Sequence, residues 1–326
     1  MKKITAILVI AIAGMSFANA QQLPLYSQYL YNKFLINPSV AGSDGYTSFN
    51  LTAREQWVGY SGAPRTYSLS WQTRFLKRSY ILKQVSPRRQ VFRPKSDGKV
   101  GMGGFIFSDK NGLVRRTGFQ ISYAYHTWLR QETQLSMGLA MTGYQYKIDE
   151  RDLNFEDSDE PWLNNDLRKG VFIPDAAFGL HLLNPRYTFG FSADQLFGAA
   201  AKLGSEAYKK LEMKRHYYIF GSYTFTDMRY HELEPSVLIK MSGQLEPQLD
   251  IGVTYIYNQS LWAGIAYRTC GVLITNIGEK YQNLWIGYAF DFSFQEIQRL
   301  TYGSHELTIA LRFGDSSRRY RWLDRY

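Results

Sequence analysis

The sequence is poor in cysteine and in long apolar runs. Its 326 residues include one cysteine, Cys270, so no intramolecular disulfide can form. After residue 20 there is no run of roughly eighteen apolar residues, which excludes a membrane-spanning helix from that part of the chain. No His-x-x-x-His or Cys-x-x-Cys spacing occurs, so a transition-metal site has little support. Stability must come from packing or from a membrane.

The first twenty residues have the pattern of a secretory signal peptide. Lys2 and Lys3 form a basic start, Ile4–Phe17 an apolar stretch, and Ala18–Ala20 a small-x-small cleavage site. We therefore predict that residues 1–20 are removed near Ala20 and that residues 21–326 are exported. The chain is basic, with a formal charge of +10, but an exported location excludes nucleic acid as a partner.

The mature chain is rich in period-two alternation, in which apolar residues interleave with small or polar ones. In the last such run Leu307, Ile309, Leu311 and Phe313 alternate with a polar set that includes Glu306, which predicts a strand with one apolar face. Fourteen runs of this kind occur, near residues 46–58, 64–75, 99–108, 115–129, 133–147, 173–184, 186–195, 215–226, 230–242, 247–257, 260–269, 271–278, 283–293 and 304–313.

Two all-β folds fit this alternation, a large soluble β protein and a transmembrane antiparallel β-barrel. An even number of strands of about ten residues each is typical of an outer-membrane barrel. Aromatic residues near strand ends also favour the barrel, because its membrane interfaces carry aromatic girdles; we assign to them Tyr60, Trp71, Trp128, Tyr146, Trp262 and Trp285. We predict a barrel of about 14 strands over residues 46–314, in the cell outer membrane.

The connections alternate in length, as they do in such barrels. Those that follow even-numbered strands are mostly short and those that follow odd-numbered strands include the long ones, so we expect the even ones to be periplasmic, together with residue 21. One even connection, Leu76–Gly98, is long and strongly basic. The same parity predicts that residues 315–326 form a periplasmic basic and aromatic tail.

Residues 21–45 precede the first predicted strand and are unusually aromatic. They include Tyr26, Tyr29, Tyr31 and Phe34, followed by Asn37-Pro38 and two glycines. Fourteen strands enclose a lumen wide enough to need filling or to hold water. We therefore predict that this segment is a plug or cap of the barrel, with these four aromatic side chains against the lumen wall. The alternative is a periplasmic tail packed on the rim.

Several stretches of the sequence are similar to one known family. They are YSQYLYNKFLINPSVAGSDG, AREQWVGYSGAPRTYSLSWQT, GMGGFIFSDKNGLVRRTGFQISYAYH, SLWAGIAYR, LWIGYAFDF and GSHELTIALRFG. With these segments the chain resembles the PorP/SprF family of outer-membrane proteins, which belong to the type IX secretion and gliding machinery of Bacteroidetes. It departs from the family in the length of Leu76–Gly98 and in the terminal DSSRRYRWLDRY.

The resemblance implies a barrel that anchors, or helps to export and display, proteins bearing a C-terminal sorting domain. It also implies contacts with periplasmic ring or peptidoglycan-binding subunits of the same machine. The alternative function, from another class, is a channel for hydrophobic or small solutes.

Catalytic and metal chemistry find little support in the sequence. Serine–histidine hydrolysis needs a base beside its nucleophile, yet the histidines scatter over strand ends and no G-x-S-x-G motif occurs; they are His126, His181, His216, His231 and His305. The acidic stretch Asp149–Glu160 lacks the glycine and the spacing of a calcium loop, so we interpret it as a solvated outer loop. We predict a non-enzymatic protein without a cofactor.

The basic connection and the tail are the candidate partner-binding regions. Arginine and aromatic residues are enriched among interface anchors. The candidates are Arg78, Arg88, Arg89, Arg93, Arg318, Arg319, Arg321 and Trp322. Attraction to anionic lipid head groups of the outer membrane is the alternative reading of this charge.

Overall fold

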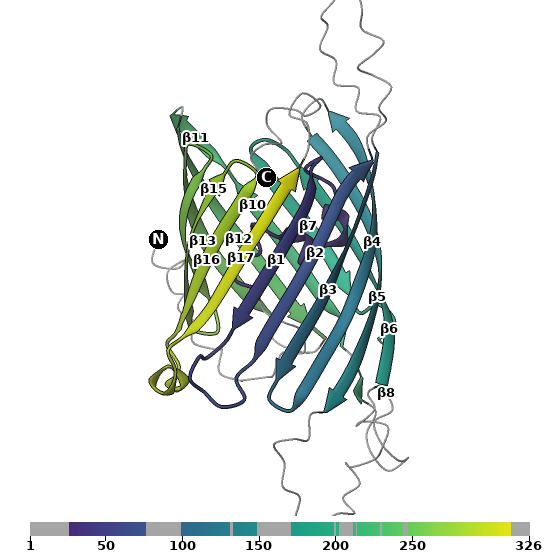
Figure 1. Ribbon diagram of the computed structural model, residues 1–326. Coiled ribbons are helices and arrows are strands. Elements are labelled where there is room, and N and C mark those ends of the chain that lie inside the picture. The colour runs from purple at the N-terminus through teal and green to yellow at the C-terminus, as the bar shows by residue number, and fades with distance from the viewer. Residues whose placement is uncertain are drawn as a thin grey trace, which may run out of the picture.

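The barrel expected from the alternation is present. The computed structural model describes residues 26–75, 99–130, 133–148, 171–198, 200–201, 211–212, 214–228, 230–243 and 247–313, and its sheet closes into an antiparallel barrel of fourteen strands (Figure 1). Within these ranges there is no helix of the length and apolarity needed to cross a membrane.

Fourteen strands form the barrel wall, and two short pieces of sheet accompany it. β11 (Phe225–Met228) lengthens the hairpin with β12, while β8 (Ala200–Ala201) and β9 (Leu211–Glu212) pair with each other. The wall consists of β1 (Thr47–Glu55), β2 (Arg65–Phe75), β3 (Val100–Asn111), β4 (Val114–Arg130), β5 (Thr133–Ile148), β6 (Val171–Leu183), β7 (Tyr187–Asp194), β10 (His216–Tyr223), β12 (His231–Ser242), β13 (Gln248–Tyr257), β14 (Leu261–Arg268), β15 (Val272–Tyr281), β16 (Leu284–Ser293) and β17 (Ser304–Phe313).

The first and last strands close the barrel. β1 pairs with β17 in antiparallel register from Thr47 opposite Phe313 to Glu55 opposite His305. Along β17 the predicted two-sidedness is confirmed, since Glu306 is 1% exposed and Leu307 is 42% exposed. Closure leaves no free sheet edge along this seam, so every backbone group of the wall can pair with a neighbouring strand.

The two ends of the barrel are named here after the two ends of β1. The Thr47 end also holds Phe75, paired with Val100, and Phe313. Residues 76–98 and 314–326 follow Phe75 and Phe313 and lie outside the described residues. The Glu55 end holds the starts of β2 and β17 and the short 3-10 helix η5 (Glu296–Leu300). That the Thr47 end faces the periplasm stays a prediction.

The N-terminal segment lies inside the barrel and runs between its two ends (Figure 1, purple). Near the Glu55 end Ser27 contacts Glu306, and near the Thr47 end the Gly42 N–H donates to Gln72 Oε1. The first described residues lie toward the Glu55 end, whereas residue 21, which we predict to begin on the same side as the Thr47 end, lies outside the described residues.

Two 3-10 helices, η1 (Lys33–Leu35) and η2 (Pro38–Val40), shape the middle of this segment. Asn37 caps η2, since its Oδ1 accepts from the Ser39 N–H at 2.9 Å, and Pro38 occupies the first helical position. The Asn37 amide also donates to the carbonyls of Leu180 and Phe191 in the wall. One side chain therefore fixes both the local turn and its place against β6 and β7.

Glycines in the wall make room for the segment. A Cβ at Gly179 would lie 2.0 Å from Asn37 Oδ1, and a Cβ at Gly138 would lie 2.3 Å from the Ser39 nitrogen. At Gly101 it would lie 2.0 Å from the Ala41 carbonyl oxygen. A Cβ at any of these three positions would force either the segment or the wall to shift.

Candidate functional site: the barrel lumen

The start of the N-terminal segment is held by carboxylates from the last two strands. The backbone N–H groups of Ser27 and Gln28 donate to the two oxygens of Glu306, each at 2.8 Å. The Ser27 hydroxyl donates to Asp291 Oδ2 at 2.7 Å. Charge-assisted hydrogen bonds of this kind are about twice as strong as neutral ones, so hydrogen bonding as well as packing holds the segment here.

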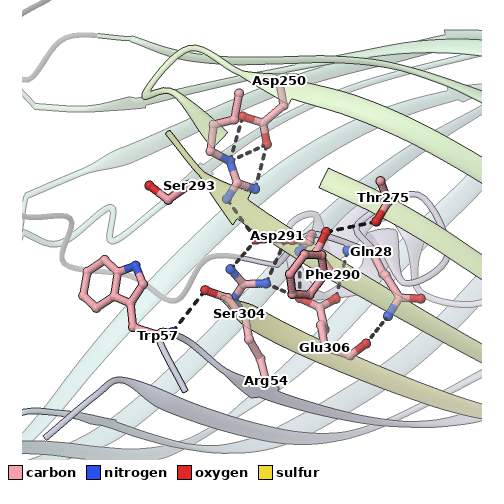
Figure 2. A network of polar contacts seen from close by, with 12 residues as sticks. Gln28, Arg54, Trp57, Asp250, Thr275, Phe290, Asp291, Ser293, Ser304 and Glu306 are labelled. Carbon is pink, nitrogen blue, oxygen red and sulfur yellow. Dashed lines mark hydrogen bonds and ion pairs between the residues drawn. The ribbon is translucent and has the colours of Figure 1, made fainter. Parts of the chain in front are cut away.

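Arg54 of β1 joins these groups into one cluster (Figure 2). Its guanidinium pairs with Asp291 at 2.7 Å and with Glu306 at 3.1 Å, and it donates to the Ser27 hydroxyl at 2.8 Å. Arg54 and Glu306 stand directly opposite each other across the β1–β17 seam. The same contacts therefore hold the segment and the closing strands.

A second buried pair extends the cluster along the wall. Arg268 of β14 binds Asp250 of β13 with three hydrogen bonds of 3.0–3.1 Å and approaches Asp291 at 3.7 Å. Lys240 lies 3.9 Å from Asp250. We call Arg54, Lys240, Asp250, Arg268, Asp291 and Glu306 the lumen charge network. Its three cations match its three anions, as buried charges require.

The four aromatic residues predicted to lie against the lumen wall are Tyr26, Tyr29, Tyr31 and Phe34. Tyr26, Tyr29 and Phe34 are buried and Tyr31 is half-buried. Phe34 meets Phe105 edge-on, with 5.9 Å between ring centroids. Burial raises the pKa of the Tyr29 hydroxyl above its ordinary value. That the segment closes the lumen to solutes stays a prediction.

Two tryptophans assigned to the aromatic girdles point inward instead. Trp262 is 4% exposed and stacks on Tyr31, with 4.7 Å between the ring centroids. Trp285 shares the inward side of β16 with Asp291 and lies under the Arg312 guanidinium at 4.1 Å. The assignment was wrong because an aromatic residue near a strand end fits a girdle and a filled lumen equally well.

A serine–histidine pair occurs in the lumen, but it is sealed. The His126 Nε2–H donates to the Ala41 carbonyl at 3.0 Å, so Nδ1 accepts from the Ser136 hydroxyl at 2.7 Å. Both side chains are fully buried, and Ala41 of the N-terminal segment lies against the ring. Within the described ranges no group of three metal-ligating residues comes together.

The candidate partner-binding residues are not among those that the structure describes. Arg78, Arg88, Arg89, Arg93, Arg318, Arg319, Arg321 and Trp322 all lie outside the described residues, and so does Asp149–Glu160. Conversely, sequence reasoning did not select the charge network. Its only signal was a lone charged residue on the polar face of each of several strands, as at Arg54 and Asp291.

Comparison with known proteins gives a family match over most of the chain. The family described as type IX secretion system membrane protein PorP/SprF matches residues 18–311. No curated protein matches the sequence. Among solved structures, the chain is similar to Omp33 of Acinetobacter baumannii, with a TM-score of 0.43, 7% identity, and 83% of this chain and 100% of that one covered. It is also similar to the toluene transporter TodX of P. putida, with a TM-score of 0.44, 8% identity, and 86% of this chain and 93% of that one covered.

Proposed function

Since the chain belongs to the PorP/SprF family of type IX secretion system membrane proteins, we propose that it anchors exported proteins at the cell surface. The cargo would be proteins with a C-terminal sorting domain, which the barrel would help to export or display. The family and the barrel make it an outer-membrane component of this system. Removal of residues 1–20 near Ala20 remains part of the proposal.

The observation that carries an anchoring role is the way in which the lumen is occupied. The N-terminal segment is tied to Glu306, Asp291 and Arg54 by buried charged contacts, and the wall has glycines where the segment approaches it. This attachment of the segment supports the proposal that the barrel is plugged. A plugged barrel would serve as an attachment point and not as an open pore. We propose no bond chemistry for it, because His126 and Ser136 lack access to substrate.

Docking to the periplasmic ring or to a peptidoglycan-binding subunit is proposed for the Thr47 end. The supporting features are the arginines that follow Phe75 and Phe313 in the sequence, because Arg pairs in a bidentate manner with carboxylates of a partner. Single cysteines at Ser86 and at Ser316 test the topology in intact cells, in a Cys270→Ser background. Slow labelling by a membrane-impermeant reagent is expected, and rapid labelling at either site would place that site outside the cell.

Deleting Tyr26–Pro38 behind an intact signal peptide tests the plug. We expect a barrel that still inserts, conducts ions in single-channel recordings and no longer displays cargo. Tyr302→Ser, at an exposed site near the Glu55 end, is the matched control and should stay silent. An inserted but silent deletion variant would refute the plug. If the full-length protein itself conducts, the alternative holds, namely a channel for hydrophobic or small solutes.

A further inference from the structure

A small pocket lies between the N-terminal segment and the wall on the side away from the charge network. Tyr26 and Ile36 of the segment form one side, and β3 to β7 with β10 form the other. Its volume is about 70 Å³, several times the roughly 10–15 Å³ that one water needs. The pocket lies toward the Glu55 end, because Asp194 is the last residue of β7. It can therefore take a compact chemical group.

Two buried polar groups in this pocket have unused hydrogen-bonding capacity. Asp175 is fixed because its Oδ1 accepts from the N–H groups of Ala176 and Phe197, at 2.7 and 3.1 Å. Its Oδ2 has no hydrogen-bond partner among the described residues, although the side chain is 3% exposed. An acceptor left unpaired in the protein interior is unfavourable, so this oxygen favours a ligand that donates a hydrogen bond.

Gln195 supplies the complementary group. It holds a left-handed backbone conformation with φ of +60°, which is costly for a residue other than glycine. Its Oε1 is bound by His216 Nδ1 at 2.9 Å, which fixes the orientation of the amide. Its Nε2 makes no hydrogen bond of 3.5 Å or less in the described part of the chain and lies near the Tyr144 hydroxyl, which also lines the pocket and also has no partner at that distance. A donor is thereby presented to the same pocket as the Asp175 acceptor.

Acidic side chains outnumber basic ones among the residues that line the pocket. Asp175 and Asp194 both line it, and within the described ranges neither makes an ion pair of 4 Å or less. The pocket's own cation, Arg116, pairs with Asp109 at 3.4 Å and lies 5.9 Å from the centre of the Tyr144 ring. A positively charged ligand in the pocket would therefore favour the ionised form of both carboxyl groups.

We propose that this pocket binds a primary ammonium that has a neighbouring carbonyl oxygen and an apolar side group. The ammonium would donate to Asp175 Oδ2 and face Asp194, while the carbonyl would accept from Gln195 Nε2. The aromatic rings of Phe105 and Tyr218 favour both an apolar group and a nearby cation. This is the chemistry of a peptide N-terminus with an apolar first residue. The site is independent of the proposed anchoring function.

Calorimetric titration of the full-length protein in detergent tests the site, with L-phenylalaninamide as the probe. Saturable binding is expected. N-acetyl-L-phenylalaninamide, which lacks the ammonium, and Asp175→Asn should each weaken binding by roughly tenfold to a hundredfold, the effect of losing a hydrogen bond to a charged group. Phenylethylammonium, which lacks the carbonyl, should bind several-fold more weakly, because Gln195 Nε2 then has no acceptor.

Controls separate binding from folding. Glu279→Gln changes an exposed carboxylate on the outside of β15 and should leave the affinity unchanged. Asp194→Asn gives a second variant if Asp175→Asn loses its heat-modifiable gel migration. No saturable heat with the unmodified protein, or equal affinity for the amide and its N-acetyl form, would overturn the proposal.

Discussion

The two sides of the lumen treat buried charge in opposite ways. On the side of β12 to β17 and β1, three cations face three anions within the charge network. On the side of β6 and β7, Asp175 and Asp194 line a pocket and make no ion pair among the described residues. In the charge network each charge has a partner of opposite sign, and these contacts stabilise the barrel. In the pocket the carboxyl groups have no such partner within the described ranges, so a ligand that pairs with them would gain binding free energy.

The largest effect is expected from Glu306→Ala. The variant removes the acceptor of two backbone N–H groups and one partner of Arg54, all of them buried. Breaking a buried charge pair costs about 3–5 kcal/mol, so the denaturant midpoint should fall markedly when unfolding is followed by heat-modifiable gel migration. Glu279→Gln is the control for loss of a carboxylate and should leave the midpoint in place. Equal midpoints for the two variants would show that the network does not hold the fold.

A smaller effect is expected from Gly138→Ala, which tests the contact between the segment and the wall. The new Cβ would lie 2.3 Å from the Ser39 nitrogen, and overpacking of this kind costs about 1–3 kcal/mol. Ion conductance should appear in single-channel recordings as the segment is displaced. Gly221→Ala is the matched control, because its Cβ would have no neighbour closer than 3.6 Å. Silence of both variants would mean that the wall yields instead of the segment.

The smallest effect is expected from Asp175→Asn. The asparagine oxygen can still accept from Ala176 and Phe197, and no ion pair among the described residues is lost, so stability should change by less than about 1 kcal/mol. The same substitution at Asp250 removes bidentate pairing with Arg268 and should cost several times more. Equal unfolding midpoints for the two variants would erase the contrast between the sides.

The strands could be predicted from the sequence because their period is local. The expected runs 304–313 and 283–293 match β17 and β16 to within one residue. The end of β1 was placed three residues too late, because the alternation continues into a turn where Trp57 has φ of 47°. The end of β15 was placed three residues too early, because Glu279, Lys280 and Tyr281 do not look like a strand and owe their pairing to β16.

Only part of the charge network could be predicted from local sequence patterns. The tight turn at Asn258-Gln259 fixes the register of β13 and β14, and that register puts Asp250 opposite Arg268. The pair Arg54–Glu306 depends instead on how the closed barrel staggers β1 against β17, which no neighbouring residues encode. The pocket could not be predicted from the sequence for the same reason, because it depends on the position that the N-terminal segment takes inside the closed barrel.

The contacts of Ser27 and Gln28 with Glu306 also set an order of events in folding. Ser27 and Glu306 are 279 positions apart in the chain, and the link from Gln28 to Glu306 spans 278. Contacts this remote form late, because the entropy lost in bringing such distant residues together must be met first. The aromatic segment is synthesised early but can be fastened only when β17 arrives beside β1. The segment is therefore seated only after the seam has closed, so the contacts between the wall and the segment inside it are among the last to form.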